Sequence, residues 1–95
     1  DDDLSIEISG QELGHRKIEE VPSIIILADE NGKVTINICV NKDGVVTKAE
    51  YNAGQSTVSI RSLVSLAIQK AKQFEFEVGK YDSQCGIMVF NIKGS

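Results

Sequence analysis

Alternating apolar and polar residues predict a β-hairpin in the first half of the chain. The alternation in Gly32–Val40 has the period of two that is expected of a strand with one buried face. Residues 41–44, Asn-Lys-Asp-Gly, have the composition of a tight turn in which Gly44 can adopt a positive φ. Residues 45–52 then predict the returning strand. The side chains expected on the apolar face are Val34, Ile36, Ile38 and Val40 in the first strand and Val45, Thr47, Ala49 and Tyr51 in the second.

A single apolar stripe predicts a helix over residues 56–74. Apolar side chains recur there at the three- and four-residue spacing of one helix face. We expect Thr57 or Ser59 to cap the amides of the first turn. We also expect Phe74 and Phe76 to close the end of the core. The stripe consists of Ile60, Leu63, Val64, Ala67, Ala71 and Phe74.

Residues 85–92 predict a last strand that is apolar on both faces. One set of alternating side chains would meet the helix, so something else is expected to cover the other set. Residues 24–27, Ile-Ile-Ile-Leu, are one candidate for this cover, and a partner protein is the other. A small sheet with a helix on one face has no room for a buried active site. Its edge strands can, however, bind an extended peptide.

Charge separates the first twenty residues from the rest of the chain. Residues 1–20 carry a net charge of −5 within a chain of net charge −4, so the remainder is nearly neutral. Neither part is a basic surface, and we expect no nucleic acid partner. Leu4, Ile6 and Ile8 alternate with polar residues, which predicts a short strand. We divide the chain into an acidic, partly ordered arm (1–20), a domain (21–93) and a tail or tag (94–95).

The candidate chemistry of the chain is sparse. A length of 95 residues suits a single domain, and no apolar run approaches the roughly 18 residues that cross a membrane. His15 is the only histidine and lies in the polar arm, so we expect neither a Ser-His-acid set nor a metal site. No Gly-rich phosphate loop occurs. These observations favour a binding domain that is not an enzyme and needs no cofactor.

Several short motifs occur in an order and spacing that are typical of one protein family. They are Gly14-His15-Arg16 followed by Pro22, Gly32-Lys33-Val34, Ile38-Cys39-Val40, Asp43-Gly44-Val45, Ala49, Ser56-Thr57, Leu63, Ala67, Ala71, Phe74, and Gln84-Cys85-Gly86-Ile87 with Phe90. Over about residues 10–93 the chain resembles the C-terminal domain of TonB, the periplasmic energy transducer, in the form common in Bacteroidetes. It departs from the family in its acidic arm and in residues 24–27, where the enteric proteins have a more helical, Tyr-Pro-containing stretch.

The resemblance implies a two-layer α+β domain, in which a three-stranded antiparallel sheet carries one main helix on one face. The last strand would lie beside the first and leave its other edge open. In the family this edge binds the TonB box, an extended segment of an outer-membrane receptor. Carried over to this chain, the binding edge consists of Cys85, Gly86, Ile87, Met88, Val89, Phe90, Asn91, Ile92 and Lys93.

The resemblance also implies a cellular role. The family's transducers are anchored to the inner membrane, reach into the periplasm and pass energy from a proton-driven motor to outer-membrane receptors for active transport. They also have an N-terminal membrane helix and a Pro-rich spacer, and we find neither segment in these 95 residues. The alternative is a TonB-fold interaction or regulatory module of a larger envelope protein.

The two cysteines are expected on the same face of the sheet, opposite the helix. In an antiparallel pair the end of the first strand lies near the start of the last, so Cys39 and Cys85 would be close enough to form a disulfide. A periplasmic protein can form such a bond. The alternative is two half-buried thiols.

Whether the outer edge of the last strand is free to bind a partner also has two interpretations. Its edge either receives a partner, or is an ordinary edge protected by the twist of the sheet or by the N-terminal arm. The chain is expected to be a monomer or a weak dimer, since edge strands can also pair between copies.

Overall fold

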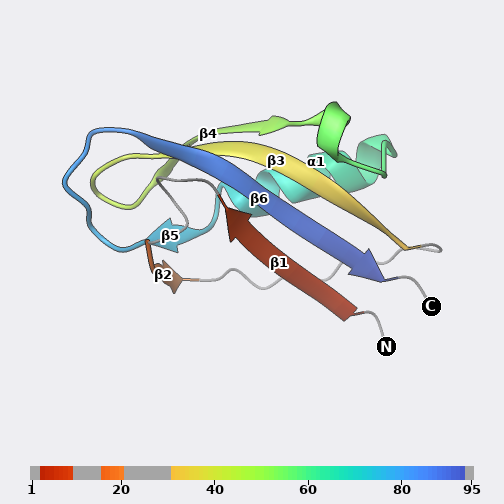
Figure 1. The fold of residues 1–95 in the computed structure, drawn as a ribbon, viewed down its shortest axis with the longest axis horizontal. Coiled ribbons are helices and arrows are strands. Elements are labelled where there is room, and N and C mark those ends of the chain that lie inside the picture. The colour runs from red at the N-terminus through yellow and green to blue at the C-terminus, as the bar shows by residue number, and fades with distance from the viewer. Residues whose placement is uncertain (1–2, 10–15, 21–30, 94–95) are drawn as a thin grey trace.

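The computed structural model describes residues 3–9, 16–20 and 31–93, and Figure 1 shows their arrangement. Strands in two antiparallel sheets dominate, with one α-helix in the described part of the chain. The elements are β1 (Asp3–Ser9), β2 (Ile18–Glu20), β3 (Gly32–Val40), β4 (Val46–Tyr51), the 3₁₀-helix η1 (Ala53–Gln55), α1 (Arg61–Ala71), β5 (Glu75–Phe76) and β6 (Gln84–Lys93).

The main sheet has four antiparallel strands in the order β1-β6-β3-β4. β3 lies at its centre and pairs with β6 along its whole length, from Gly32 opposite Ile92 to Val40 opposite Gln84. β2 and β5 form a separate two-stranded sheet. The predicted α+β class is therefore correct, and so is the placement of the last strand beside the first strand of the hairpin. The prediction of a single three-stranded sheet is wrong, because β1 adds a fourth strand and β2 pairs with β5.

The hydrophobic core lies between the main sheet and α1, which packs on β3 and β4. Phe74 follows the helix and meets Phe90 of β6 edge to face, with ring centroids 6.5 Å apart. Phe74 and Phe76 are both buried, as predicted for residues that close the end of the core. The buried apolar residues are Val34, Ile36, Ile38, Val40, Val46, Val58, Ala67, Ala71, Phe74, Phe76, Met88, Phe90 and Ile92.

The helix begins later than the sequence predicts. α1 begins at Arg61, whereas the prediction began it at residue 56. Ser56 and Thr57 are instead bound to the start of β3: Ser56 Oγ accepts the Thr35 amide and Thr57 Oγ1 accepts the Lys33 amide, each at 2.8 Å. Their hydroxyls therefore satisfy strand amides instead of helix amides.

The first turn of α1 has no side-chain cap. The N-cap residue is Ile60, whose side chain cannot accept a hydrogen bond, so the predicted caps Thr57 and Ser59 are wrong. Ile60 is 49% exposed and does not belong to the buried stripe. The stripe that packs on the sheet is centred on Ala67 and Ala71, whose small side chains let the helix approach the strands closely.

The predicted turn closes the hairpin between β3 and β4. Gly44 has φ +89°, and its amide donates to the Asn41 carbonyl at 3.1 Å. The Asn41 side chain accepts the amides of Asp43 and Val45, each at 3.0 Å. An Asn at the first position thus stabilises the turn with its own side chain.

A register shift reverses the predicted faces of the first residues of β4. The ladder between β3 and β4 is irregular between Cys39 and Val40, and Val46 lies opposite Val40. Val46 is 8% exposed and Val45 is 47% exposed, whereas the alternation predicted Val45 on the apolar face. An irregularity of this kind turns the side chains on one side of it to the other face.

Three predictions concern residues outside the described part of the chain. They are the cover of the last strand by residues 24–27, the place of His15 in the polar arm and the tail at 94–95. Both β1 and β2 lie within the first twenty residues, so this segment contributes a strand to each sheet.

Candidate functional site: the outer edge of β6

β6 is a ten-residue strand whose side chains alternate between the two faces of the sheet. Met88, Phe90 and Ile92 point into the core and are buried. Ile87 and Val89 belong to the opposite face and are half-buried there. The strand thus has the two apolar faces that its sequence predicts.

β1 pairs with the edge of β6 that faces away from β3. Seven register pairs join the two strands, from Asp3 opposite Lys93 to Ser9 opposite Ile87. Figure 1 shows β1 at the margin of the main sheet, on the opposite side from β4. The expectation that this edge is open is therefore wrong for most of its length, because the N-terminal arm covers residues 87–93. Of the nine residues proposed for the binding edge, Cys85 and Gly86 lie beyond this register.

β1 also contributes side chains to the core. Ile6 lies opposite Phe90 and Ile8 lies opposite Met88 in the antiparallel register. Both isoleucines are half-buried and pack against the buried cluster. The alternation of Leu4, Ile6 and Ile8 was the sequence signal for this strand, but it did not identify the strand to which β1 pairs.

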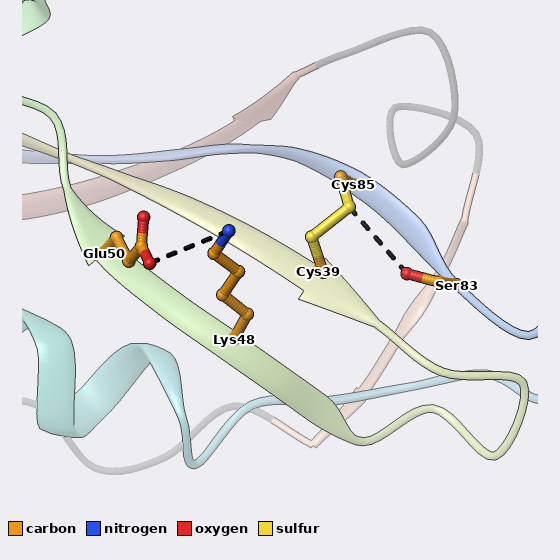
Figure 2. Close-up of polar contacts among 5 residues, drawn as sticks. All are labelled: Cys39, Lys48, Glu50, Ser83 and Cys85. Carbon is orange, nitrogen blue, oxygen red and sulfur yellow. Dashed lines mark hydrogen bonds and ion pairs between the residues drawn. A yellow bond between two sulfur atoms is a disulfide. The ribbon is translucent and has the colours of Figure 1, made fainter.

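A disulfide joins β3 to β6 on the face opposite α1. Cys39 and Cys85 are directly opposite in the register, and their Cα atoms are 4.0 Å apart. The distance is shorter than the roughly 5–6 Å expected from the sequence. The cysteines therefore form the disulfide and are not the two half-buried thiols of the alternative interpretation. Figure 2 shows that the bond lies on the same face as Lys48 and Glu50 of β4.

A shallow hollow of about 410 Å³ surrounds the disulfide on this face. Asn37 and Ile87 contribute to its lining, together with Lys48 and Glu50, which form an exposed ion pair at 3.7 Å. Its lining contains a disulfide, an amide and two opposite charges. This set can make polar contacts with a partner but has no activated nucleophile.

Arg16 connects three segments that are far apart in the sequence. Its Nε and Nη2 both donate to the Glu77 carbonyl, at 2.9 and 2.6 Å. Nη2 also donates to the Asn41 carbonyl in the hairpin turn at 2.9 Å, and Nη1 donates to Gln84 Oε1 at 3.1 Å. A planar guanidinium can bind several acceptors at once in this way. We call this set of hydrogen bonds the Arg16 clasp.

Sequence reasoning identified Arg16 only as part of a motif and missed the clasp. A cation that bonds carbonyl groups leaves no pattern of charged partners in the sequence. The Arg16 side chain also lines a hollow of about 180 Å³ with Tyr81, whose ring is largely exposed. The clasp fixes the chain at residue 16, between the arm that forms β1 and the rest of the fold.

The described residues contain no cluster of three or more His, Cys, Asp or Glu side chains that could hold a metal ion. No helix in the described ranges is both long and apolar enough to cross a bilayer.

Comparison with known proteins finds no match for this chain among protein-family models, curated proteins or solved structures.

Proposed function

We propose that this chain is the peptide-binding domain of a TonB-type energy transducer. It binds an extended segment of an outer-membrane receptor, the TonB box, by adding it as a strand to the outer edge of β6. In the full-length protein the domain acts in the periplasm, and the remainder of the protein anchors it to the inner membrane and contacts the proton-driven motor there.

The pairing of β1 with β6 is the observation that carries this proposal. An edge that accepts seven residues in continuous register has its backbone donors and acceptors at the spacing that an added strand requires. The apolar residues of that added strand face Phe90 and Met88, and its polar residues alternate with them. The same edge would suit a receptor segment in which apolar and polar residues alternate in the same way.

The disulfide supports the proposed compartment. Disulfides persist in oxidising environments such as the bacterial periplasm, and they are rare in the reducing cytosol. Cys39 and Cys85 are joined between two neighbouring strands. This bond fits a protein that folds and works outside the cytosol.

NMR titration tests the proposal. The isotopically labelled chain would be titrated to millimolar concentrations with TonB-box peptides from receptors of the same organism. We expect saturable shifts of the amides of residues 87–93, while the amides of the far edge strand β4 remain unchanged. The same peptide with proline substituted at the positions whose amides would face β6 is the matched control, since it cannot donate hydrogen bonds to that strand. A folded chain that shows no shifts with any receptor peptide would contradict the proposal.

The pairing of β1 also favours a second candidate function. A TonB-fold module whose edge is permanently closed by its own arm would act in an envelope protein through another surface, such as the hollow at the disulfide. Shifts confined to the lining of that hollow, with residues 87–93 unaffected, would identify this alternative.

A further inference from the structure

The strand β1 occupies the place that the proposed function assigns to a receptor peptide. It covers residues 87–93 of β6, and it places alternating isoleucines against the core. An incoming strand and β1 cannot both pair with the same backbone groups. Any peptide that binds this edge must therefore compete with β1.

The attachment of β1 is weaker than that of the strands beside it. β1 pairs with β6 alone, whereas β3 has a partner on each side. Ile6 and Ile8 are half-buried, whereas Ile36 and Ile38 of β3 are fully buried. The helix packs on β3 and β4, which lie on the other side of β6 from β1. β1 lies at the margin of the sheet with a single ladder, so we expect it to open more readily than β3 or β6, each of which pairs on both sides.

The Arg16 clasp lets β1 leave without loosening the rest of the fold. Arg16 is bound to Asn41, Glu77 and Gln84 and does not depend on β1 for these contacts. Six residues separate Ser9 from Arg16, so their Cα atoms are never more than ~25 Å apart. A strand that stays so close to its own site has an effective concentration of about 1 mM there.

We propose that β1 is a displaceable occupant of the β6 edge, which a receptor peptide replaces by strand exchange. This inference rests on the proposed function, and it adds that β1 regulates peptide binding at this edge. The replacing segment is an extended peptide with apolar residues opposite Met88, Phe90 and Ile92 and polar residues between them. β1 raises the apparent Kd of such a peptide by a factor of one plus the ratio of the effective concentration of β1 to the Kd of β1 for the open edge.

Peptide binding to three forms of the full chain tests the exchange. The first is the wild type, the second is Ile6→Ser/Ile8→Ser, which removes the apolar contacts of β1, and the third is the conservative control Ile6→Val/Ile8→Val. Two labelled probes would be used: a peptide with the sequence of residues 1–10, and the receptor peptides of the NMR titration. Fluorescence anisotropy would measure the Kd of each pair.

We expect the serine variant to bind both probes about tenfold more tightly than the wild type, if β1 itself binds the open edge with a Kd of about 0.1 mM and an effective concentration of about 1 mM. The valine variant should bind like the wild type. Equal affinity of the receptor peptides for all three forms would overturn the exchange. NMR shifts at residues 87–93 would then leave the proposed function standing, whereas shifts confined to the hollow at the disulfide would contradict it too. Binding of only the peptide of residues 1–10 would support the displaceable edge and contradict the receptor function. Binding of neither probe to a folded serine variant would overturn both.

Hydrogen exchange of the wild type provides a test that needs no variant. We expect the amides that join β1 to β6 to have protection factors at least tenfold lower than those that join β3 to β6. Equal protection would mean that β1 opens only with the whole domain, and it would overturn the exchange.

Discussion

Removing the Cys39–Cys85 disulfide should strongly lower the stability of the domain. The bond joins residues that are 46 positions apart. In the chain-entropy model, a closed loop of this length lowers the entropy of the unfolded chain by ~13 cal/mol/K, which corresponds to ~4 kcal/mol at 25 °C. Measured values for disulfides are typically about 2–4 kcal/mol, and a domain of this size has a total stability of about 5–10 kcal/mol. The bond thus supplies a large part of the free energy of unfolding.

Urea unfolding of Cys39→Ser/Cys85→Ser would measure this effect. We expect the free energy of unfolding to fall by about 2–4 kcal/mol relative to the oxidised wild type. The wild type with reductant should behave like the variant. Ser83→Ala is the matched control, because Ser83 Oγ lies 3.9 Å from Cys85 Sγ and its removal leaves the bond intact. A loss of less than about 1 kcal/mol in both the variant and the reduced wild type would refute the reasoning.

Three further substitutions test the packing and the turn, each by urea unfolding. Arg16→Ala should lower the free energy of unfolding by about 2 kcal/mol, since it removes the charged donor shared by several carbonyl groups. Its control is Lys17→Ala at an exposed neighbouring position, which should change this free energy by less than about 0.5 kcal/mol. Gly44→Ala should lower the free energy of unfolding by at least about 2 kcal/mol, because φ is +89° and a Cβ would collide with the Phe76 carbonyl. Its control is Gly54→Ala, where a Cβ meets only ordinary contacts and stability should hardly change. Phe74→Ala should cost about 3–5 kcal/mol through the cavity it leaves beside β6. Equal losses within either matched pair, or a loss below about 1 kcal/mol for Phe74→Ala, would contradict the corresponding argument.

The elements that the sequence predicts correctly are those whose signal is local. The period of two in Gly32–Val40 and the Asn-Lys-Asp-Gly turn each depend on neighbouring residues, and the structure has both. The alternation in their strands also predicted that Cys39 and Cys85 share a face, whereas the pairing of these strands was implied only by the family resemblance. Patterns within one element thus predicted the hairpin and most of the faces of its strands, and they left the disulfide as one of two alternatives.

The features that the sequence did not predict depend on contacts between distant segments. The register shift near Val40 exchanges the faces of Val45 and Val46, and no alternation reveals it in advance. Ser56 and Thr57 look like helix caps, yet the nearby amides of β3 bind their hydroxyls.

The candidate site was predicted only in part for the same reason. The sequence indicated a short strand in the arm and an edge on the last strand, and it left protection of that edge by the arm as one of two interpretations. Local propensity cannot decide which of several edges a strand joins, because that choice depends on the packing of the completed sheet.

The disulfide also determines how the sheet responds to force. A load applied along β6 would tend to slide this strand past β3, and a slide of two residues would restore an antiparallel ladder with the same faces buried. The covalent bond between Cys39 and Cys85 forbids that slide, since it holds one register pair fixed. Load therefore passes from β6 into β3 without a change of register. The ladder on the outer side of β6 has no such bond, so under tension the strand at this edge can slide or separate while the register between β6 and β3 stays fixed.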